Sequence, residues 1–178
     1  VGTRARDNAG STGRVRHAPL LPMLAPDLTA VERMSDSTGI LQHAIYSVPD
    51  RRHGYCIDDN ARALILMSRI DTIAEDVRDH WTSIYASFVQ FAWNPERRRF
   101  RNFMAFDRSW TEEEGSEDSN GRALWALGVT AAEARAQKHR DWAVTLYDTT
   151  ASIALELGSP RARAFAMLGA SAMLSAHP

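Results

Sequence analysis

The sequence predicts an all-α protein of repeated helical hairpins that pack as an α/α toroid. Three observations lead to this fold class. Apolar residues recur at intervals of three and four over most of the chain from residue 27 onward, which is the period of an amphipathic helix. One helix-opening motif occurs twice at a fixed spacing, and such repetition is typical of stacked structural units. In addition, predicted helices rich in small residues alternate along the chain with predicted helices that carry bulky aromatic residues.

The composition is that of a globular protein with one sizeable core. The chain has 178 residues, of which 44% are hydrophobic and 24% are charged. The net charge of −1 gives no indication of a nucleic-acid partner. No apolar run reaches the roughly 18 residues of a membrane span, and no signal-peptide pattern opens the chain. We therefore expect a cytoplasmic protein with neither a membrane span nor a nucleic-acid partner.

Two segments of the chain differ in pattern. Residues 1–26 are expected to be a linker or a disordered arm, because residues 1–19 carry Gly, Ser and Arg without apolar periodicity. Residues 27–178 are expected to form the helical domain. Its pattern is helical from Asp27, which can cap the sequence LTAVERM, and segment 39–48 continues apolar at mixed spacing.

The later helices have clear starts and stops. They are expected at about 58–70, 74–93, 119–137, 140–157 and 160–175. Residues 49–54 interrupt the pattern before the first of them, and Asn94-Pro95 ends the second. Ser159-Pro160 starts the last helix with a cap followed by proline. Aromatic residues and alternation make 97–110 the only strand candidate, as a short hairpin or an extended loop.

The repeated motif reads Asp-x-Asn-x-Arg-Ala-Leu. It covers residues 58–64 and 118–124, an offset of 118 − 58 = 60 residues, and a fainter copy lies at 162–168. Each copy opens a predicted helix, and a second helix follows each of the first two copies, so the unit is a pair of helices. Small residues in the repeated helices allow close helix approach. An inner ring of these helices inside an outer ring of bulkier ones describes a toroid, and an open solenoid of the same units is the alternative.

Four acidic residues stand at the starts of the repeated helices. In a toroid these starts converge at one end, so the carboxylates would share one cleft. Carboxylates crowded in a partly apolar cleft acquire separated pKa values, which acid–base catalysis on glycosides requires. The candidate catalytic residues are Asp58, Asp59, Glu117 and Asp118. Helix capping is the alternative role, and no accompanying His spacing supports a metal site.

Five other residues are candidates for binding a sugar. They are Gln42, His43, Tyr55, Asn60 and Trp110. The rings of Tyr55 and Trp110 suit the apolar face of a sugar, with core packing as the alternative. Gln42 and His43 lie beside the interrupting segment, where a structural role for His43 is slightly favoured.

Three residues within the motifs are expected to have structural roles. Arg62 and Arg122 recur one turn inside their helices, where pairing with acidic neighbours is favoured over substrate binding. Cys56 is the only cysteine, which excludes an internal disulfide and a Cys-rich zinc site. It is expected to be a small buried residue and not a nucleophile. No metal and no other cofactor is expected.

Two long blocks, at 36–64 and 115–128, resemble a family of bacterial proteins with the six-hairpin glycosidase-like α/α toroid. Weaker similarity continues through 159–170. Such domains occur as, or attached to, proteins described as glycosyltransferases. A complete toroid of six hairpins has about a dozen helices, and six or seven are expected here. The resemblance therefore implies that residues 27–178 form the first half of the domain, and this half alone is expected to be inactive.

The motifs and the resemblance together predict a carbohydrate-active domain. It would act on or bind a glycan through an acidic cleft, in the manner of a glycoside hydrolase. The alternative is a non-catalytic sugar-binding or scaffolding module that accompanies a glycosyltransferase domain. The chain has no Gly-rich phosphate loop of the Rossmann kind, so transferase activity would belong to an attached domain. A third hypothesis, a helical repeat that binds a peptide, predicts an apolar groove in place of the acidic rim.

Overall fold

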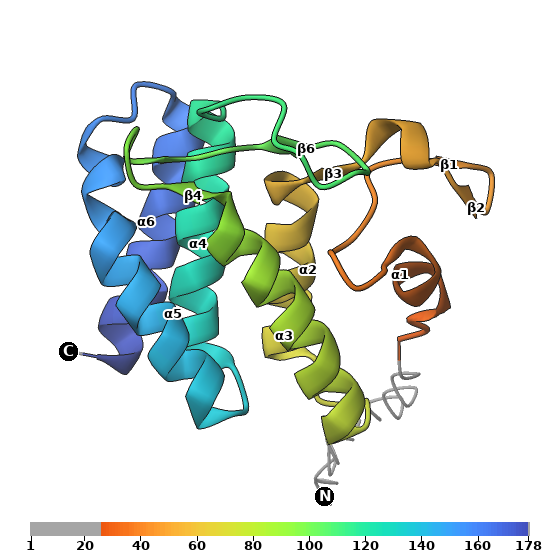
Figure 1. Ribbon diagram of the computed structural model, residues 1–178. Helices are drawn as coiled ribbons and strands as arrows, with labels where there is room; N and C mark the ends of the chain where they lie inside the picture. The colour runs from red at the N-terminus through yellow and green to blue at the C-terminus, as the bar shows by residue number, and fades with distance from the viewer. Residues whose placement is uncertain (1–25, 178) are drawn as a thin grey trace, which may run out of the picture.

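The computed structural model describes residues 26–177, and this part of the chain is mostly helical, as predicted (Figure 1). Its helices are α1 (Thr29–Met34), α2 (Ile57–Arg69), α3 (Glu75–Ala92), α4 (Glu117–Glu133), α5 (Gln137–Thr150) and α6 (Pro160–Ala176). Five of these six described helices are longer than ten residues, which confirms the expected helical content. The arm predicted at 1–26 lies outside the described residues except for Pro26.

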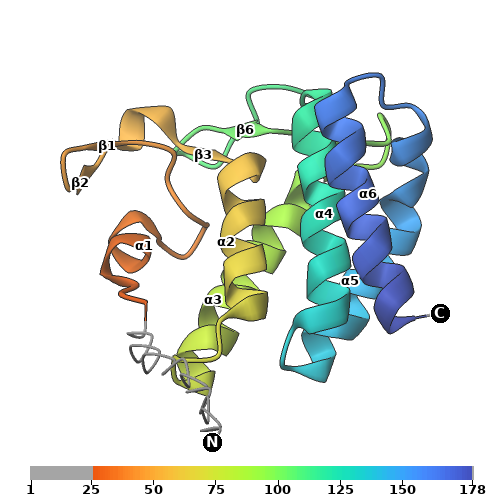
Figure 2. The same cartoon turned by 180° about the vertical axis from the view of Figure 1, so that it is seen from behind.

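The five long helices form two layers. Helices α2, α4 and α6 lie side by side and run in the same direction, from the loop end of the molecule downward in Figure 1. Helices α3 and α5 run the opposite way and cover one face of that layer, as the view from behind in Figure 2 also shows. Each of α2 and α4 therefore forms an antiparallel hairpin with the helix that follows it.

Helix α4 lies at the centre of the first layer. Eleven of its residues are buried, whereas α6 has only three buried residues, because α4 has a neighbouring helix on both sides. A Cβ atom built on Gly128 would lie 2.2 Å from the carbonyl oxygen of Gly169, and one built on Gly121 would lie 2.4 Å from that of Ala162. Small residues thus allow α4 and α6 to approach almost to backbone contact.

Polar contacts join α2 to α4 at the ends opposite to the loops. The hydroxyls of Ser68 and Thr130 lie 3.1 Å apart and both side chains are buried. Arg69 donates two hydrogen bonds of 2.9 Å to the carboxylate of Glu133. The apolar side chains between these helices are fully buried, among them Leu64, Met67, Leu124 and Leu127.

Six short strands lie at the loop end: β1 (Ala44–Ile45), β2 (Val48–Pro49), β3 (Tyr55–Cys56), β4 (Trp93–Asn94), β5 (Arg99–Phe100) and β6 (Phe103–Met104). They form three antiparallel pairs, β1 with β2, β3 with β6 and β4 with β5. The prediction that 97–110 is the only strand candidate was therefore wrong, since three strands precede α2. Tyr46 takes a left-handed conformation with φ of 56°, which lets the chain turn between β1 and β2. This hairpin lies largely in segment 39–48, whose apolar residues showed neither a helical nor a strand period.

Helix ends differ from the expected ones by a few residues. Helix α1 ends at Met34, as the predicted sequence LTAVERM does, but α5 ends at Thr150, and residues 151–155 form a short 3-10 segment in place of the predicted helix to 157. Ser159 caps α6 with Pro160 in its first position, as predicted. Asp27 accepts the backbone N–H of Thr29 at 2.9 Å, but the cap position of α1 is Leu28 and not Asp27.

Candidate functional site

The four predicted catalytic carboxylates lie at one end of the molecule. Asp58 and Asp59 are the second and third residues of α2, and Glu117 and Asp118 are the first two residues of α4. Both helices begin at the loop end (Figure 1). None of the four is itself the cap residue, because the cap positions are Cys56, whose side chain makes no cap hydrogen bond, and Ser116, which accepts the N–H of Ser119 at 3.2 Å. All four lie in the first turns of their helices, where negative charge suits the helix dipole.

Asp58 forms an ion pair between neighbouring helices. Its carboxylate accepts a hydrogen bond of 2.8 Å from Nε of Arg122 on α4. The side chain of Arg122 is only 12% exposed, and its guanidinium lies 4.2 Å from the ring centroid of Phe165 on α6. Arg122 therefore links three parallel helices, in agreement with the pairing expected from the repeat.

Asp118 and Glu117 hold the start of α6. Asp118 accepts hydrogen bonds from the guanidinium of Arg161 and from the hydroxyl of Ser159. The contact with Arg161 lowers the pKa of Asp118, so its carboxylate stays ionised. Glu117 accepts the backbone N–H groups of Gly158 and Ser159 at 2.9 and 2.5 Å. Both acidic side chains thus fasten α4 to the chain that enters the next helix.

Asp59 has two partners in its own segment. It accepts a hydrogen bond of 2.7 Å from Arg62 and one of 3.1 Å from the thiol of Cys56. Burial raises the pKa of Cys56, and the negative charge of Asp59 raises it further. The thiol is therefore protonated, which agrees with the prediction that Cys56 is a buried residue and not a nucleophile.

Asn60 and Asn120 have the same structural role in the two copies of the motif. Asn60 accepts the N–H of Ile40 at 3.0 Å and donates to the carbonyl of Cys56 at 2.8 Å. Asn120 accepts the N–H of Phe100 at 2.8 Å and donates to the carbonyl of Ser116 at 2.9 Å. In both copies the backbone partner lies 20 residues upstream. The sugar-binding role predicted for Asn60 was wrong, because its amide is fully buried and saturated by backbone groups.

Tyr55 is also part of the core. Only 1% of it is exposed, and its hydroxyl donates a hydrogen bond of 2.6 Å to Asp36. Burial, followed by the bond to Asp36, raises the pKa of Tyr55 to about 12. Its ring stacks on Phe106 at a centroid distance of 6.2 Å. Tyr55 therefore does not offer a face to a sugar, and the prediction of stacking was wrong for this residue.

The three other predicted sugar-binding residues differ in exposure. Gln42 bridges the loop by donating to the carbonyls of His53 and Tyr55, at 2.9 and 3.2 Å. His43 is exposed and its ring centroid lies 4.5 Å from that of His53. Trp110 is half-buried beside the rings of Phe88 and Phe91, at centroid distances of 5.6 and 5.4 Å. Only Trp110 lies next to a surface pocket that contains other aromatic residues.

A groove between α1 and α2 brings two predicted site residues together. Gln42 and Asp59 line it with Arg62, and its volume is about 370 Å³. The rest of the lining is aliphatic: Val31, Met34, Ile40, Leu41, Ala63 and Leu66. Asp59 is the one carboxylate among these residues, so the groove does not supply the pair of carboxylates that glycoside hydrolysis requires.

A second pocket was not predicted. It lies between α3 and the loops and has a volume of about 160 Å³. It is lined by Ser37, Thr38, Ser87, Phe88, Phe91, Met104 and Arg108. We call it the α3 pocket. Its residues come from three segments that are distant in sequence, so no local motif indicates it. Only the structure shows that Phe91, on the apolar period of α3, is exposed.

The α3 pocket combines an aromatic surface with hydroxyl groups. Phe91 is 58% exposed, and Phe88 lies beneath it against Trp110. The hydroxyl of Thr38 is buried and has no hydrogen-bond partner among the described residues. This hydroxyl lies beside the hydroxyl of Tyr55, where it partly offsets the rise in the pKa of Tyr55 that burial causes, so the exposed hydroxyls of the pocket are those of Ser37 and Ser87.

Residues 26–177 show neither a metal-binding cluster nor a membrane-spanning helix. Among them, no cluster of three or more His, Cys, Asp or Glu side chains is arranged to hold a metal ion. Nor does that part of the chain include a helix with the length and apolar character needed to cross a membrane.

Comparisons with known proteins assign no family to the chain. No protein-family model, no curated protein and no solved structure matches it.

Proposed function

We propose that residues 27–178 form a carbohydrate-associated module that binds a glycan without cleaving it. The α3 pocket is the observation that carries this proposal. Apolar C–H faces of sugars suit an exposed aromatic ring such as Phe91, and sugar hydroxyls suit the exposed side chains of Ser37 and Ser87. This combination of one aromatic surface and a few polar groups favours a sugar over a purely apolar ligand.

The contacts of the acidic residues support binding over hydrolysis. Hydrolysis by paired carboxylates requires one of them to be protonated when the substrate binds. Asp118 is held ionised by Arg161, and Asp58 is paired with the nearly buried Arg122. Glu117 accepts hydrogen bonds from two backbone N–H groups, those of Gly158 and Ser159. These contacts are those of groups that hold helices together.

We further propose that the hairpins are packed as part of an (α/α)6 toroid. Helices α2, α4 and α6 would be inner helices and α3 and α5 outer ones, consistent with their directions and layers (Figure 2). The outer face of α6 fits this arrangement, since Met167 and Leu174 are 71% and 68% exposed and resemble a surface that packs on a further helix. A glycosyltransferase domain is the partner that this proposal favours.

Isothermal titration of the chain with a panel of oligosaccharides tests the sugar-binding proposal. At least one oligosaccharide should bind, and Phe91→Ala should weaken that binding because it removes the exposed ring. Leu155→Ala is the matched control, since Leu155 is 89% exposed and does not line the pocket. Absence of binding to every member of the panel, or equal loss in both variants, would refute the proposal.

A glycoside hydrolase is the second candidate, and the gathering of four carboxylates at one end favours it. The same titrated samples can be followed by NMR for released reducing sugars. Turnover that disappears in Asp58→Asn, with the fold retained, would replace the binding proposal with this one. We expect no turnover.

A further inference from the structure

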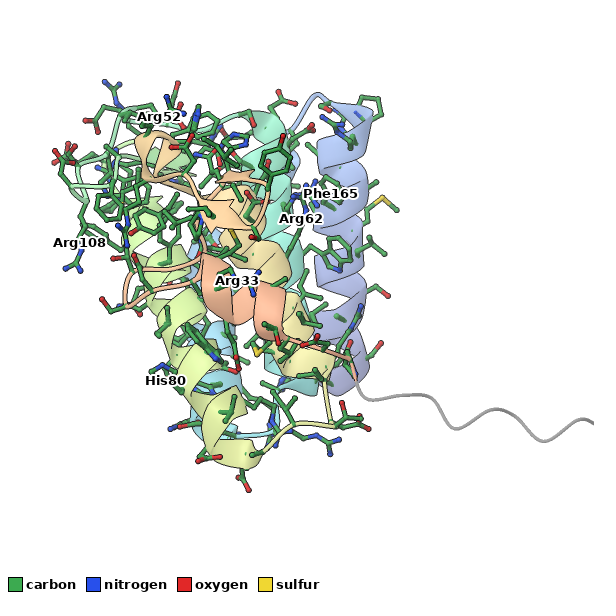
Figure 3. The ribbon with its side chains drawn as sticks, turned by 90° about the vertical axis from the view of Figure 1, so that its right-hand side faces the viewer. Arg33, Arg52, Arg62, His80, Arg108 and Phe165 are labelled. Carbon is green, nitrogen blue, oxygen red and sulfur yellow. The ribbon has the colours of Figure 1, made fainter. Side chains whose placement is uncertain are left out.

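We infer that the α3 pocket selects a sugar that carries an acidic group, with Arg108 as the residue that recognises this group. The inference rests on the proposed sugar binding and names its ligand class. It starts from the position of Arg108 on the lining of the pocket, in the loop between β6 and α4. Figure 3 shows this side chain at the outer edge of the loops.

The backbone holds Arg108 in an unusual conformation. Its φ is 71°, in the left-handed region that residues other than glycine and asparagine rarely adopt. The turn around it is held by hydrogen bonds of 2.9 Å from the N–H of Arg108 to the carbonyl of Ala105, and from the N–H of Ala105 to that of Ser109. Asp107 accepts both the N–H and the hydroxyl of Ser109. The turn therefore fixes the point from which the arginine side chain leaves the backbone.

The guanidinium of Arg108 makes no ion pair with a described residue. Its one side-chain contact there is a long hydrogen bond of 3.4 Å to the hydroxyl of Ser37. Two acidic residues, Asp107 and Asp36, accept hydrogen bonds from other groups and form no ion pair with Arg108. Asp107 is bonded to Ser109, which lowers its pKa, and Asp36 accepts the hydroxyl of Tyr55 and the N–H groups of Thr38 and Gly39.

Several other arginines of the loop end are paired, whereas Arg51, Arg97 and Arg98, which form no ion pair with a described residue, do not line the α3 pocket. Arg52 pairs with Asp50, Arg101 with Glu113 and Arg122 with Asp58. Arg108 therefore differs from these three in having a charge that no carboxylate among the described residues neutralises. A cation on the rim of a pocket attracts anions, and a guanidinium binds a carboxylate or a phosphate through two parallel hydrogen bonds.

The lining of the pocket favours an acidic sugar over a bare anion. Ser37 and Ser87 supply exposed hydroxyls to a sugar ring, and Phe91 supplies an apolar face for it. The pocket is small, with a volume of about 160 Å³, so it has room for no more than a single sugar unit. A uronate presents its carboxylate beside such a ring, and a sugar phosphate presents the same charge on a longer arm.

Fluorescence titration of the full chain tests this inference, because Trp110 lies against Phe88 and Phe91 of the pocket. The probes are glucuronate, glucose, glucose 6-phosphate and inorganic phosphate, at constant ionic strength. Glucuronate should bind about tenfold or more tightly than glucose, as expected for a charge-assisted bidentate contact. Stronger binding of glucose 6-phosphate than of glucuronate would identify the phosphate as the acidic group and would also support the inference.

Arg108→Gly removes the guanidinium and keeps the left-handed backbone, which glycine adopts freely. It should bring the affinity for glucuronate down to that for glucose, so that the ratio of the two affinities falls to about one. Arg33→Gln is the matched control, because it removes an exposed arginine from α1 that does not line the pocket. Arg108→Lys should restore part of the preference.

Two results would overturn the inference and leave sugar binding standing: equal affinities for glucuronate and glucose, or an equal loss of both in Arg108→Gly. Binding of inorganic phosphate as tight as that of the acidic sugars would also overturn it, because the sugar would then contribute nothing. Binding of none of the probes would count against the inference and against the proposed function together.

Discussion

Single residues of the repeated motif act mainly by connecting distant parts of the backbone. Asn60 and Asn120 show this most clearly, since each joins its helix to the residue 20 positions upstream and to the residue four positions upstream. The side-chain amide of asparagine can accept an N–H through its oxygen and donate to carbonyls through its NH₂ group at the same time. A carboxylate in this position could not donate, which explains why the motif has an amide beside its acidic residues.

Asn120→Ala should lower the free energy of unfolding by about 2 kcal/mol, because the buried N–H of Phe100 would lose its partner. Urea unfolding followed by circular dichroism measures the change. Asn60→Ala should have a similar effect through the N–H of Ile40. If both variants are as stable as the wild type, the amides do not hold the loops in place.

Asp118 should make stability depend on pH in the acid range. Its pKa in the folded protein lies below the usual 3.8 because of Arg161, so the stabilisation is present above pH 3.8 and is lost as the pH falls through the lower folded pKa. The difference in stability between wild type and Asp118→Asn should be constant from about pH 8 to about pH 5 and should vanish at lower pH.

Thermal unfolding of both proteins across this pH range provides the measurement. Arg161→Gln is the matched variant, and it should show the same pH dependence as Asp118→Asn because each removes the same contact. A difference that grows as the pH falls below 4 would contradict the assigned ion pair.

At the scale of elements, the spacing between α4 and α6 is set by small residues. Gly121, Gly128 and Gly169 each face backbone atoms of the opposite helix, so no side chain fits between the two at these points. Glycine weakens a helix by about 1 kcal/mol relative to alanine, and the close contact offsets this cost. The short distance between α4 and α6 therefore depends on these glycines having no Cβ atom.

Gly128→Ala should destabilise the protein by about 1–3 kcal/mol, although alanine is the better helix former. The reason is the 2.2 Å distance from the new Cβ to the carbonyl oxygen of Gly169, which forces the helices apart. Chemical denaturation measures the effect. Ser171→Ala, on the exposed face of α6, is the control and should change stability by no more than about 0.5 kcal/mol. A stabilised Gly128→Ala variant would show that the helices can separate freely.

For the whole molecule, one apolar core extends through both helix layers and reaches the loops. It includes Leu64 of α2, Val89 of α3, Leu124 of α4 and Ala143 of α5, together with Phe100 and Met104 of the short strands. Because the strands and the helices share this core, the loop end does not form a separate unit. Its conformation depends on the helices that it covers.

Unfolding should therefore be a single cooperative transition. Circular dichroism reports on the helices, and tryptophan fluorescence reports in part on Trp110 at the loop end, so the two signals should give the same urea midpoint. A fluorescence midpoint at a clearly lower urea concentration would mean that the loops unfold first, and the α3 pocket would then be lost before the helices.

Local patterns in the sequence were enough to predict the main helices and the repeat. Apolar periodicity located α2 to α6 to within a few residues at most ends, and Ser159-Pro160 marked the start of α6. The offset of 60 residues correctly indicated two helices that begin at the same end. These features depend on neighbours within one or two turns of a helix, which the sequence displays directly.

Tertiary structure alone decided the roles of the candidate site residues and the position of the pocket. Asp58 faces Arg122 across 64 residues, Tyr55 meets Asp36 inside the core, and Thr38 joins Phe91 at the α3 pocket. A polar side chain acts on the groups that surround it, and those groups come from segments that only the folded chain brings together. The sequence by itself therefore determined which helices form and where the acidic residues gather, while the packing of the helices decided that these residues hold the fold together and that the open pocket lies beside α3.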